Sequence, residues 1–120
     1  MSVCDSAGNA IVQNTNGLAP IQSLNAVSAT GAGTALDGLV SRANASATVT
    51  TSAGVSAGSV VLEGSLDGTN FVTLGSAIST TAATTTYTVA ATNVFMRFVR
   101  ARVATAITGG TISAWVSVSG

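Results

Sequence analysis

The sequence contains no histidine and no lysine, and only 7% of its 120 residues are charged. The few charged residues balance to a formal net charge of zero: Asp5, Asp37, Glu63, Asp67, Arg42, Arg97, Arg100 and Arg102. Catalysis needs a proton-transfer group or an activated nucleophile, and without histidine or lysine the 15 serines have no evident base to activate them. We therefore expect a protein that is not an enzyme and that holds no cofactor.

Cysteine and long apolar runs are also scarce. Cys4 is the only cysteine, so no internal disulfide is expected. No apolar run approaches the ~18 residues of a membrane span, and the N-terminus lacks the basic and apolar regions of a signal peptide. These absences predict a protein made in the cytoplasm that has no membrane partner.

The low fraction of charged residues indicates which kind of partner the chain could bind. Soluble monomers are designed with about 25–35% charged residues on their surfaces, well above the 7% of this chain. GC-rich codon usage would explain the missing lysines better than the missing acids. A nucleic-acid-binding domain would carry net positive charge and interleaved aromatic residues, whereas aromatic residues make up 4% here. The composition favours a subunit of a protein assembly without a nucleic-acid partner.

Small and β-branched residues are what the chain has in abundance, with 21 Ala, 18 Thr, 15 Ser and 13 Gly. Several short segments alternate apolar and polar residues, and no helical period persists. These segments predict strands near residues 35–40, 46–52, 59–65, 70–74, 84–89, 94–103 and 111–118. About seven short strands at this spacing are typical of a small antiparallel β-sandwich or jelly roll. Asp67-Gly68 predicts a hairpin turn, and residues 108–110 predict the turn between the last two strands.

The first 33 residues differ from the rest, with turn formers, the only proline and weak periodicity. We expect residues 1–33 to form an extended N-terminal arm, and residues 34–120 to form the sandwich domain. The arm is either ordered by contact with a neighbouring subunit or a frayed terminus. Its apolar residues Ile11, Val12 and Ile21 are candidate interface residues.

The carboxylates offer little chemistry. Glu63 occupies an outward strand position and Asp67 a turn, so a structural role for this pair is favoured over a glycosidase role. The loop with Asp67 and Asn70 offers two plausible side chains for calcium, which needs more oxygen ligands. We expect no catalytic residues and no metal site.

Arg97, Arg100 and Arg102 form the densest group of charged residues in the sequence. Arg100 and Arg102 share one face of a regular strand, whereas Arg97 points to the other face unless a bulge intervenes. We expect these three arginines to pair with Glu63 and Asp67 across strands, or to form bidentate contacts with carboxylates on a partner subunit. They are candidate interface residues.

Trp115 is a further candidate interface residue. Ile112, Ala114, Val116 and Val118 form an inward stripe on the last strand, so Trp115 lies on the opposite face. Either that face is covered as well, or the indole is exposed for a protein contact or for stacking on a sugar.

Residues 62–75 (LEGSLDGTNFVTLG) and 95–103 (FMRFVRARV) together carry a resemblance that covers roughly residues 59–118. The pattern resembles small β-sandwich virion proteins of tailed bacteriophages, in particular head decoration proteins, and is similar to discoidin-like sandwiches. The resemblance implies a non-enzymatic protein on the capsid surface of a virion. It would bind the major capsid protein, bridge capsid subunits and assemble as a homotrimer.

Two other functions remain open. A carbohydrate- or receptor-binding sandwich of a phage tail or cell-surface protein is the alternative, with Trp115 as its contact. The abundance of threonine also suggests an ice-binding protein, but the threonines follow no fixed repeat.

Overall fold

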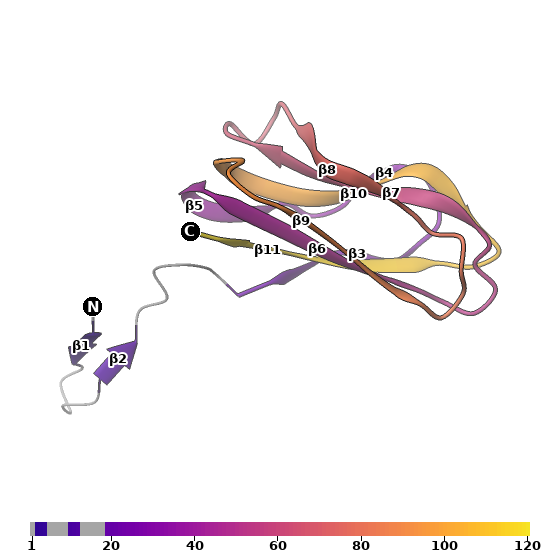
Figure 1. Ribbon diagram of the computed structural model, residues 1–120, viewed down its shortest axis with the longest axis horizontal. Coiled ribbons are helices and arrows are strands. Elements are labelled where there is room, and N and C mark those ends of the chain that lie inside the picture. Colours follow the sequence, from indigo (N-terminus) through magenta and orange to yellow (C-terminus); the bar gives the residue numbers. More distant parts are fainter. Residues whose placement is uncertain (1, 5–9, 13–18) are drawn as a thin grey trace.

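The computed structural model describes residues 2–4, 10–12 and 19–120, with side chains from residue 19 onward. Near the N-terminus, β1 (Ser2–Cys4) pairs antiparallel with β2 (Ala10–Val12). From residue 19 onward the chain forms nine strands in two antiparallel sheets and contains no helix. This architecture confirms the predicted all-β sandwich (Figure 1).

The first sheet has five strands, and β10 (Met96–Thr108) lies at its centre. On one side β10 pairs with β7 (Ala57–Ser65), which pairs in turn with β8 (Val72–Ser79). On its other side, different parts of β10 pair with β4 (Gly31–Ala32) and with β5 (Leu36–Arg42). The 13 residues of β10 are long enough to hold both short strands.

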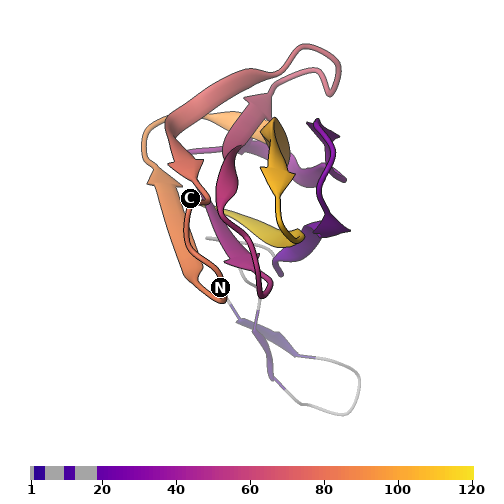
Figure 2. The same ribbon diagram turned by 90° about the vertical axis from the view of Figure 1, so that its right-hand side faces the viewer.

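The second sheet has four strands in the order β3-β11-β6-β9. Its central strands are β11 (Ile112–Ser119) and β6 (Asn44–Thr51), and its edges are β3 (Ile21–Val27) and β9 (Thr86–Ala91). The end-on view shows the two sheets facing each other (Figure 2). The connection at residues 109–111 passes from β10 in one sheet to β11 in the other, so the predicted turn joins two sheets.

The core between the sheets consists mainly of small aliphatic side chains. The inward stripe predicted on the last strand is confirmed, since its four members are at most 3% exposed. Opposite them, Val99, Ala101 and Val103 of β10 and Leu62 of β7 are fully buried. Full burial of a valine or leucine side chain contributes about 1.5–3 kcal/mol, and alanine contributes much less. Each of the few larger side chains therefore matters for stability.

The predicted boundary at residue 33 is wrong. β3 and β4, which lie within the predicted arm, pair with β11 and β10, so the sandwich begins at Ile21 rather than at residue 34. Alternation is weak in β3 because its pairing with β11 shifts register twice and Ala26 has a φ of 49°. Leu24 of β3 is nevertheless buried in the core. The sequence pattern fails here because bulges break the two-residue period.

Candidate interaction surfaces

Arg97 pairs with Asp37 on the neighbouring strand β5. Its Nε and Nη2 atoms donate to the two carboxylate oxygens of Asp37 at 2.8 and 3.0 Å. A register shift between Met96 and Phe98 marks the bulge that allows Arg97 to change its direction. Hydrogen bonding to Arg97 lowers the pKa of Asp37, and the same contact raises the pKa of Arg97. One guanidinium and one carboxylate therefore form a charge-balanced pair.

Arg100 and Arg102 share a single carboxylate, that of Glu63 on β7. Arg100 Nε donates to Glu63 Oε1 at 3.0 Å, and Arg102 Nε donates to Glu63 Oε2 at 2.8 Å. The Glu63 side chain is only 7% exposed, whereas the arginine side chains are 25% and 36% exposed. The predicted pairing of arginines with Glu63 is thus confirmed for two of the three.

Two aromatic rings lie against these guanidinium groups. The Arg100 Cζ atom lies 3.7 Å from the centroid of the Phe71 ring, and the Arg97 Cζ atom lies 4.9 Å from that of Phe98. Guanidinium groups stack favourably on aromatic faces. Phe71 ends the loop that joins β7 to β8, so this loop supplies an aromatic cover for part of the arginine cluster.

The predicted pairing of an arginine with Asp67 is wrong, because the loop itself occupies this carboxylate. Asp67 Oδ1 accepts hydrogen bonds from the backbone N–H groups of Thr69 and Asn70 and from Ser65 Oγ, each at 2.8 Å. Asp67 Oδ2 accepts a bond from Asn70 Nδ2 at 2.7 Å. These bonds, led by the two backbone N–H groups, lower the pKa of Asp67 well below its ordinary value. Side-chain bonding of this kind is typical of Asx turns.

This arrangement also bears on the calcium hypothesis. Both carboxylate oxygens of Asp67 already accept bonds from within the loop. In the part of the chain that the structure describes, no group of three or more His, Cys, Asp or Glu residues gathers in a way that could hold a metal ion.

The Asp67 loop predicts a dependence of stability on pH. Because the folded-state pKa of Asp67 lies below its unfolded value of about 3.9, its ionised form stabilises the folded state above that pH. This contribution falls as the pH drops through 4 toward the folded-state pKa. We expect Asp67→Asn to show a smaller loss of stability between pH 6 and pH 3 than the unmodified protein, as measured by urea unfolding midpoints. An equal loss in both proteins would contradict this role of the loop.

Trp115 lies on the outer face of β11, as predicted, and is 37% exposed. It pairs in register with Gln22 on one side and Thr48 on the other. Hydroxyl side chains line the neighbouring positions, including Ser46 and Ser117, whose Oγ atoms lie 2.7 Å apart. The outer face of the second sheet is thus a hydroxyl-rich surface with one partly exposed indole, and an interface role for Trp115 stays a prediction.

The three apolar candidates of the predicted arm lie in different places. Ile21 belongs to the edge strand β3, where it pairs with Val116 and packs partly buried against the core. The backbone of Ile11 and Val12 forms β2. Their side chains lie outside the described residues, so their interface role stays a prediction.

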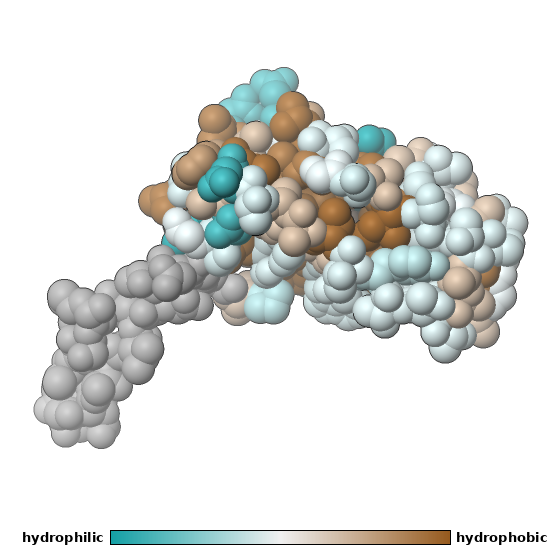
Figure 3. Space-filling model, in the orientation of Figure 1, coloured by the Kyte–Doolittle hydropathy of each residue, from teal (hydrophilic) through white to brown (hydrophobic). Residues whose placement is uncertain are grey.

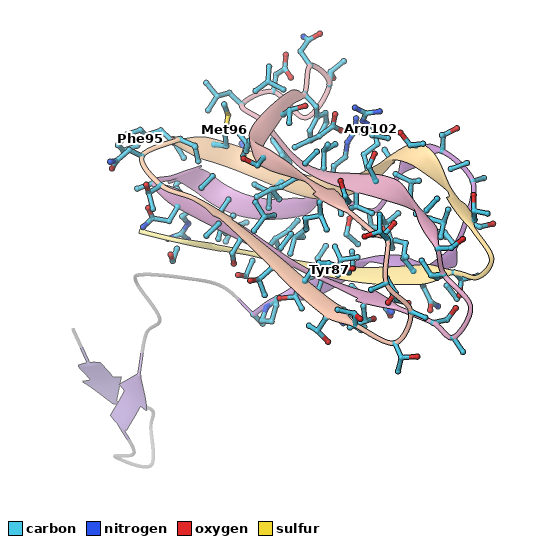
Figure 4. All side chains as sticks on the ribbon, turned by 45° about the vertical axis from the view of Figure 1, so that its right-hand side comes forward. Tyr87, Phe95, Met96 and Arg102 are labelled. Atoms are coloured by element: carbon cyan, nitrogen blue, oxygen red, sulfur yellow. The ribbon has the colours of Figure 1, made fainter. Side chains whose placement is uncertain are left out.

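A surface that the sequence pattern does not predict lies at one end of the sandwich. Five large apolar residues are between 52% and 64% exposed, and we call them the apolar end: Leu39, Val40, Leu66, Val72 and Phe95. They belong to β5, to the ends of the β7–β8 connection and to the residue before β10, which meet at the same end (Figure 1). Figure 3 shows hydrophobic residues exposed at this end, and Figure 4 places Phe95 and Met96 there, away from Arg102.

Two residues of the apolar end are held in a strained backbone conformation. Leu39 has a φ of 69° and Phe95 a φ of 54°, in the left-handed region that bulky side chains rarely adopt. Asp37 Oδ1 accepts a bond from the Leu39 N–H, and the Arg42 Nε donates to the Gly38 carbonyl, so the segment is fixed. Leu66 and Val72 of the apolar end also line a depression of about 250 Å³, whose other lining residues are Gly64, Ser65, Asp67, Asn70 and Met96. Strain that displays apolar side chains to solvent points to a use for them.

The opposite end of the sandwich is closed by its own hydrogen bonds. Ser52 N–H donates to the Thr111 carbonyl, Thr111 N–H donates to Ser52 Oγ, and Thr84 N–H donates to the Ser52 carbonyl. Gly54 and Gly109 pack backbone against backbone, and both have a positive φ. The loops at this end form hydrogen bonds with one another, whereas large side chains are exposed at the apolar end.

The chain is similar to known proteins in its fold. No family model and no curated protein sequence matches the chain. The crystal structure of SPBc2 prophage-derived protein YomS matches with a TM-score of 0.63, covering 93% of this chain and 100% of that one, at 11% identity. The sandwich is a fold found in a prophage-derived protein. The crystal structure of PBSX exported protein XepA matches with a TM-score of 0.66 and 14% identity, covering 98% of this chain but 42% of XepA. No helix long and apolar enough to span a membrane occurs among the described residues.

Proposed function

We propose that this chain is a non-enzymatic structural protein of a bacteriophage virion, and specifically a decoration protein on the outer surface of the phage head. It would bind the major capsid protein, bridge neighbouring capsid subunits and act as a homotrimer. The observation that carries the proposal is the apolar end, where five large apolar side chains are exposed to solvent and two of them, Leu39 and Phe95, have a positive φ. The fold match to YomS over the whole of that chain supports a phage origin.

The charged groups support a role without catalysis. The carboxylates of Asp37, Glu63 and Asp67 each accept hydrogen bonds that hold a strand pair or a loop in place. Hydrogen bonds of this kind, made within the fold, support a structural role for each carboxylate. These residues therefore serve the architecture of the sandwich.

Binding to a capsid can be weak per subunit and strong overall. Many copies on a repetitive shell gain strength through multivalency. An apolar patch at one end of a small sandwich suits such a contact, because burying its large apolar side chains releases water.

The test uses phage particles that lack the protein. We expect such particles to lose resistance to heat and low salt and to regain it when the purified protein is added. The double variant Leu39→Asn and Phe95→Asn should fold at least as well, since asparagine tolerates a positive φ better than leucine or phenylalanine. It should nevertheless bind the shells at least tenfold more weakly.

Two results would overturn the proposal. One is that particles lacking the protein survive heat and low salt as well as complete ones. The other is that the double asparagine variant binds and protects the shells as well as the unmodified protein does.

The alternative function is a carbohydrate- or receptor-binding module, which the hydroxyl-rich face around Trp115 favours. An indole that is partly exposed among hydroxyl groups can stack on a sugar ring. Glycan-array binding that is lost in Trp115→Ala, together with failure to bind shells, would establish this alternative in place of the decoration role.

A further inference from the structure

In the Arg100–Glu63–Arg102 cluster, several guanidinium N–H groups donate to no acceptor within the described residues. Each guanidinium uses its Nε atom to reach Glu63. No other acceptor among the described residues takes a bond from the Nη atoms of either arginine. A guanidinium has five N–H groups, so each arginine keeps four donors on its two Nη atoms. Both arginine side chains are partly exposed, and these donors are open to a ligand.

The cluster is also held in place. Glu63 is buried, and it anchors both guanidinium groups from beneath through its two oxygens. Arg100 and Arg102 are two residues apart on β10, so they project from the same face at a spacing of about 6–7 Å. The Phe71 ring covers one face of the Arg100 guanidinium. Fixing the donors in advance reduces the entropy that binding would otherwise cost.

The charge of the cluster is not balanced. Two guanidinium groups face one carboxylate, which leaves a net charge of +1 at this position. The neighbouring Arg97–Asp37 pair uses a two-bond fork between one guanidinium and one carboxylate, so its charges are balanced. β10 therefore carries a charge-balanced guanidinium–carboxylate pair and, close to it, a cluster with one carboxylate for two guanidinium groups.

We propose that Arg100 and Arg102 form a receptor for one carboxylate, supplied by an aspartate or glutamate side chain of a protein partner. A planar carboxylate accepts parallel N–H bonds from guanidinium groups, and one negative charge brings the cluster to neutrality. A nucleic-acid backbone would need an extended run of positive charge, whereas this chain has no net charge and no lysine. The receptor is independent of the decoration role, because any protein partner with an accessible carboxylate could use it.

The experiment is a titration of the full chain followed by NMR of the arginine side-chain N–H signals. Sodium acetate is the first probe and inorganic phosphate the second, each at constant ionic strength kept by sodium chloride. We expect acetate to produce saturable shifts of the Arg100 and Arg102 signals. The Arg97 signals should stay nearly unchanged, since that guanidinium already holds Asp37.

Variants separate the fork geometry from the charge. Arg102→Lys keeps the positive charge and loses the planar fork, so acetate binding should weaken about tenfold. Arg102→Gln should abolish saturable binding. Arg97→Gln is the matched control and should leave acetate binding unchanged. Thermal unfolding of each variant verifies that it is folded, and Arg100→Lys replaces Arg102→Lys if that variant fails to fold.

The proposal fails if acetate shifts all arginine signals equally and without saturation, which indicates screening only. It also fails if Arg102→Lys binds acetate as well as the unmodified protein, or if phosphate binds more tightly than acetate. Because acetate binding needs no phage particle, failure of this receptor and failure of the decoration role are observed separately.

Discussion

Glu63→Ala is expected to lower the free energy of unfolding by about 2–4 kcal/mol. The substitution leaves Arg100 and Arg102 side by side without the carboxylate that separates their charges. Breaking a buried ion pair by removing one partner typically costs about 3–5 kcal/mol. We expect a smaller cost than is typical, because both guanidinium groups are partly exposed and water screens their charges. Urea unfolding at pH 7 measures the effect.

Asp37→Ala is the matched control for Glu63→Ala. It also removes a carboxylate from an arginine on β10, but the Arg97–Asp37 pair is much more exposed, with 43% and 38% of the two side chains accessible. We expect a clearly smaller change in stability than for Glu63→Ala. An equal loss in the free energy of unfolding for the two variants would contradict the argument that the burial of Glu63 makes its ion pairs more important for stability.

Leu62→Ala is expected to destabilise the protein by about 2–5 kcal/mol, the range for leucine truncation in a packed core. Leu62 is fully buried in a core composed largely of alanine and valine. Such a core has few long side chains that could move into the cavity. A loss of this size is a large fraction of the 5–15 kcal/mol that typically separates folded from unfolded protein.

Leu66→Ala is the control for Leu62→Ala, because it removes the same atoms four residues away. Leu66 is 62% exposed at the apolar end. Its truncation should change stability by no more than about 0.5 kcal/mol. Thermal and urea unfolding of both variants provide the comparison. A Leu66→Ala variant as unstable as Leu62→Ala would mean that the apolar end supports the fold rather than faces a partner.

The sequence predicted strands where alternation is regular. In β11 every second residue faces the core, and the outward position of Trp115 follows directly from that period. In β3 two register shifts and the left-handed backbone at Ala26 disturb the period, so this strand looked like part of an arm. Local pattern is informative only where the strand is regular.

Some contacts of the candidate site residues could be predicted from the sequence, and others could not. The pairing of Arg100 and Arg102 with Glu63 was predictable, since all three occupy outward positions of predicted strands. Asp37 as the partner of Arg97 was not, because 60 residues separate them and the pairing of β5 with β10 leaves no local signal. The sequence pattern predicts Phe95 inside a strand, whereas this residue precedes β10, has a positive φ and is exposed. Nothing in the local sequence reveals a strained backbone at a bulky residue.

The order of the strands along the chain has a consequence for how the protein folds. β10 and β11 are the last two strands of the sequence, yet each is a central strand of its sheet. β3 has β11 as its strand partner, and β4 and β5 have β10, so these early strands stay without their partners until residues 96–119 have been made. Pairing between strands so distant in sequence makes folding slow, because large loops must close first. On the ribosome the sandwich should assemble only after synthesis has passed β11, with its early strand edges exposed to other chains until then.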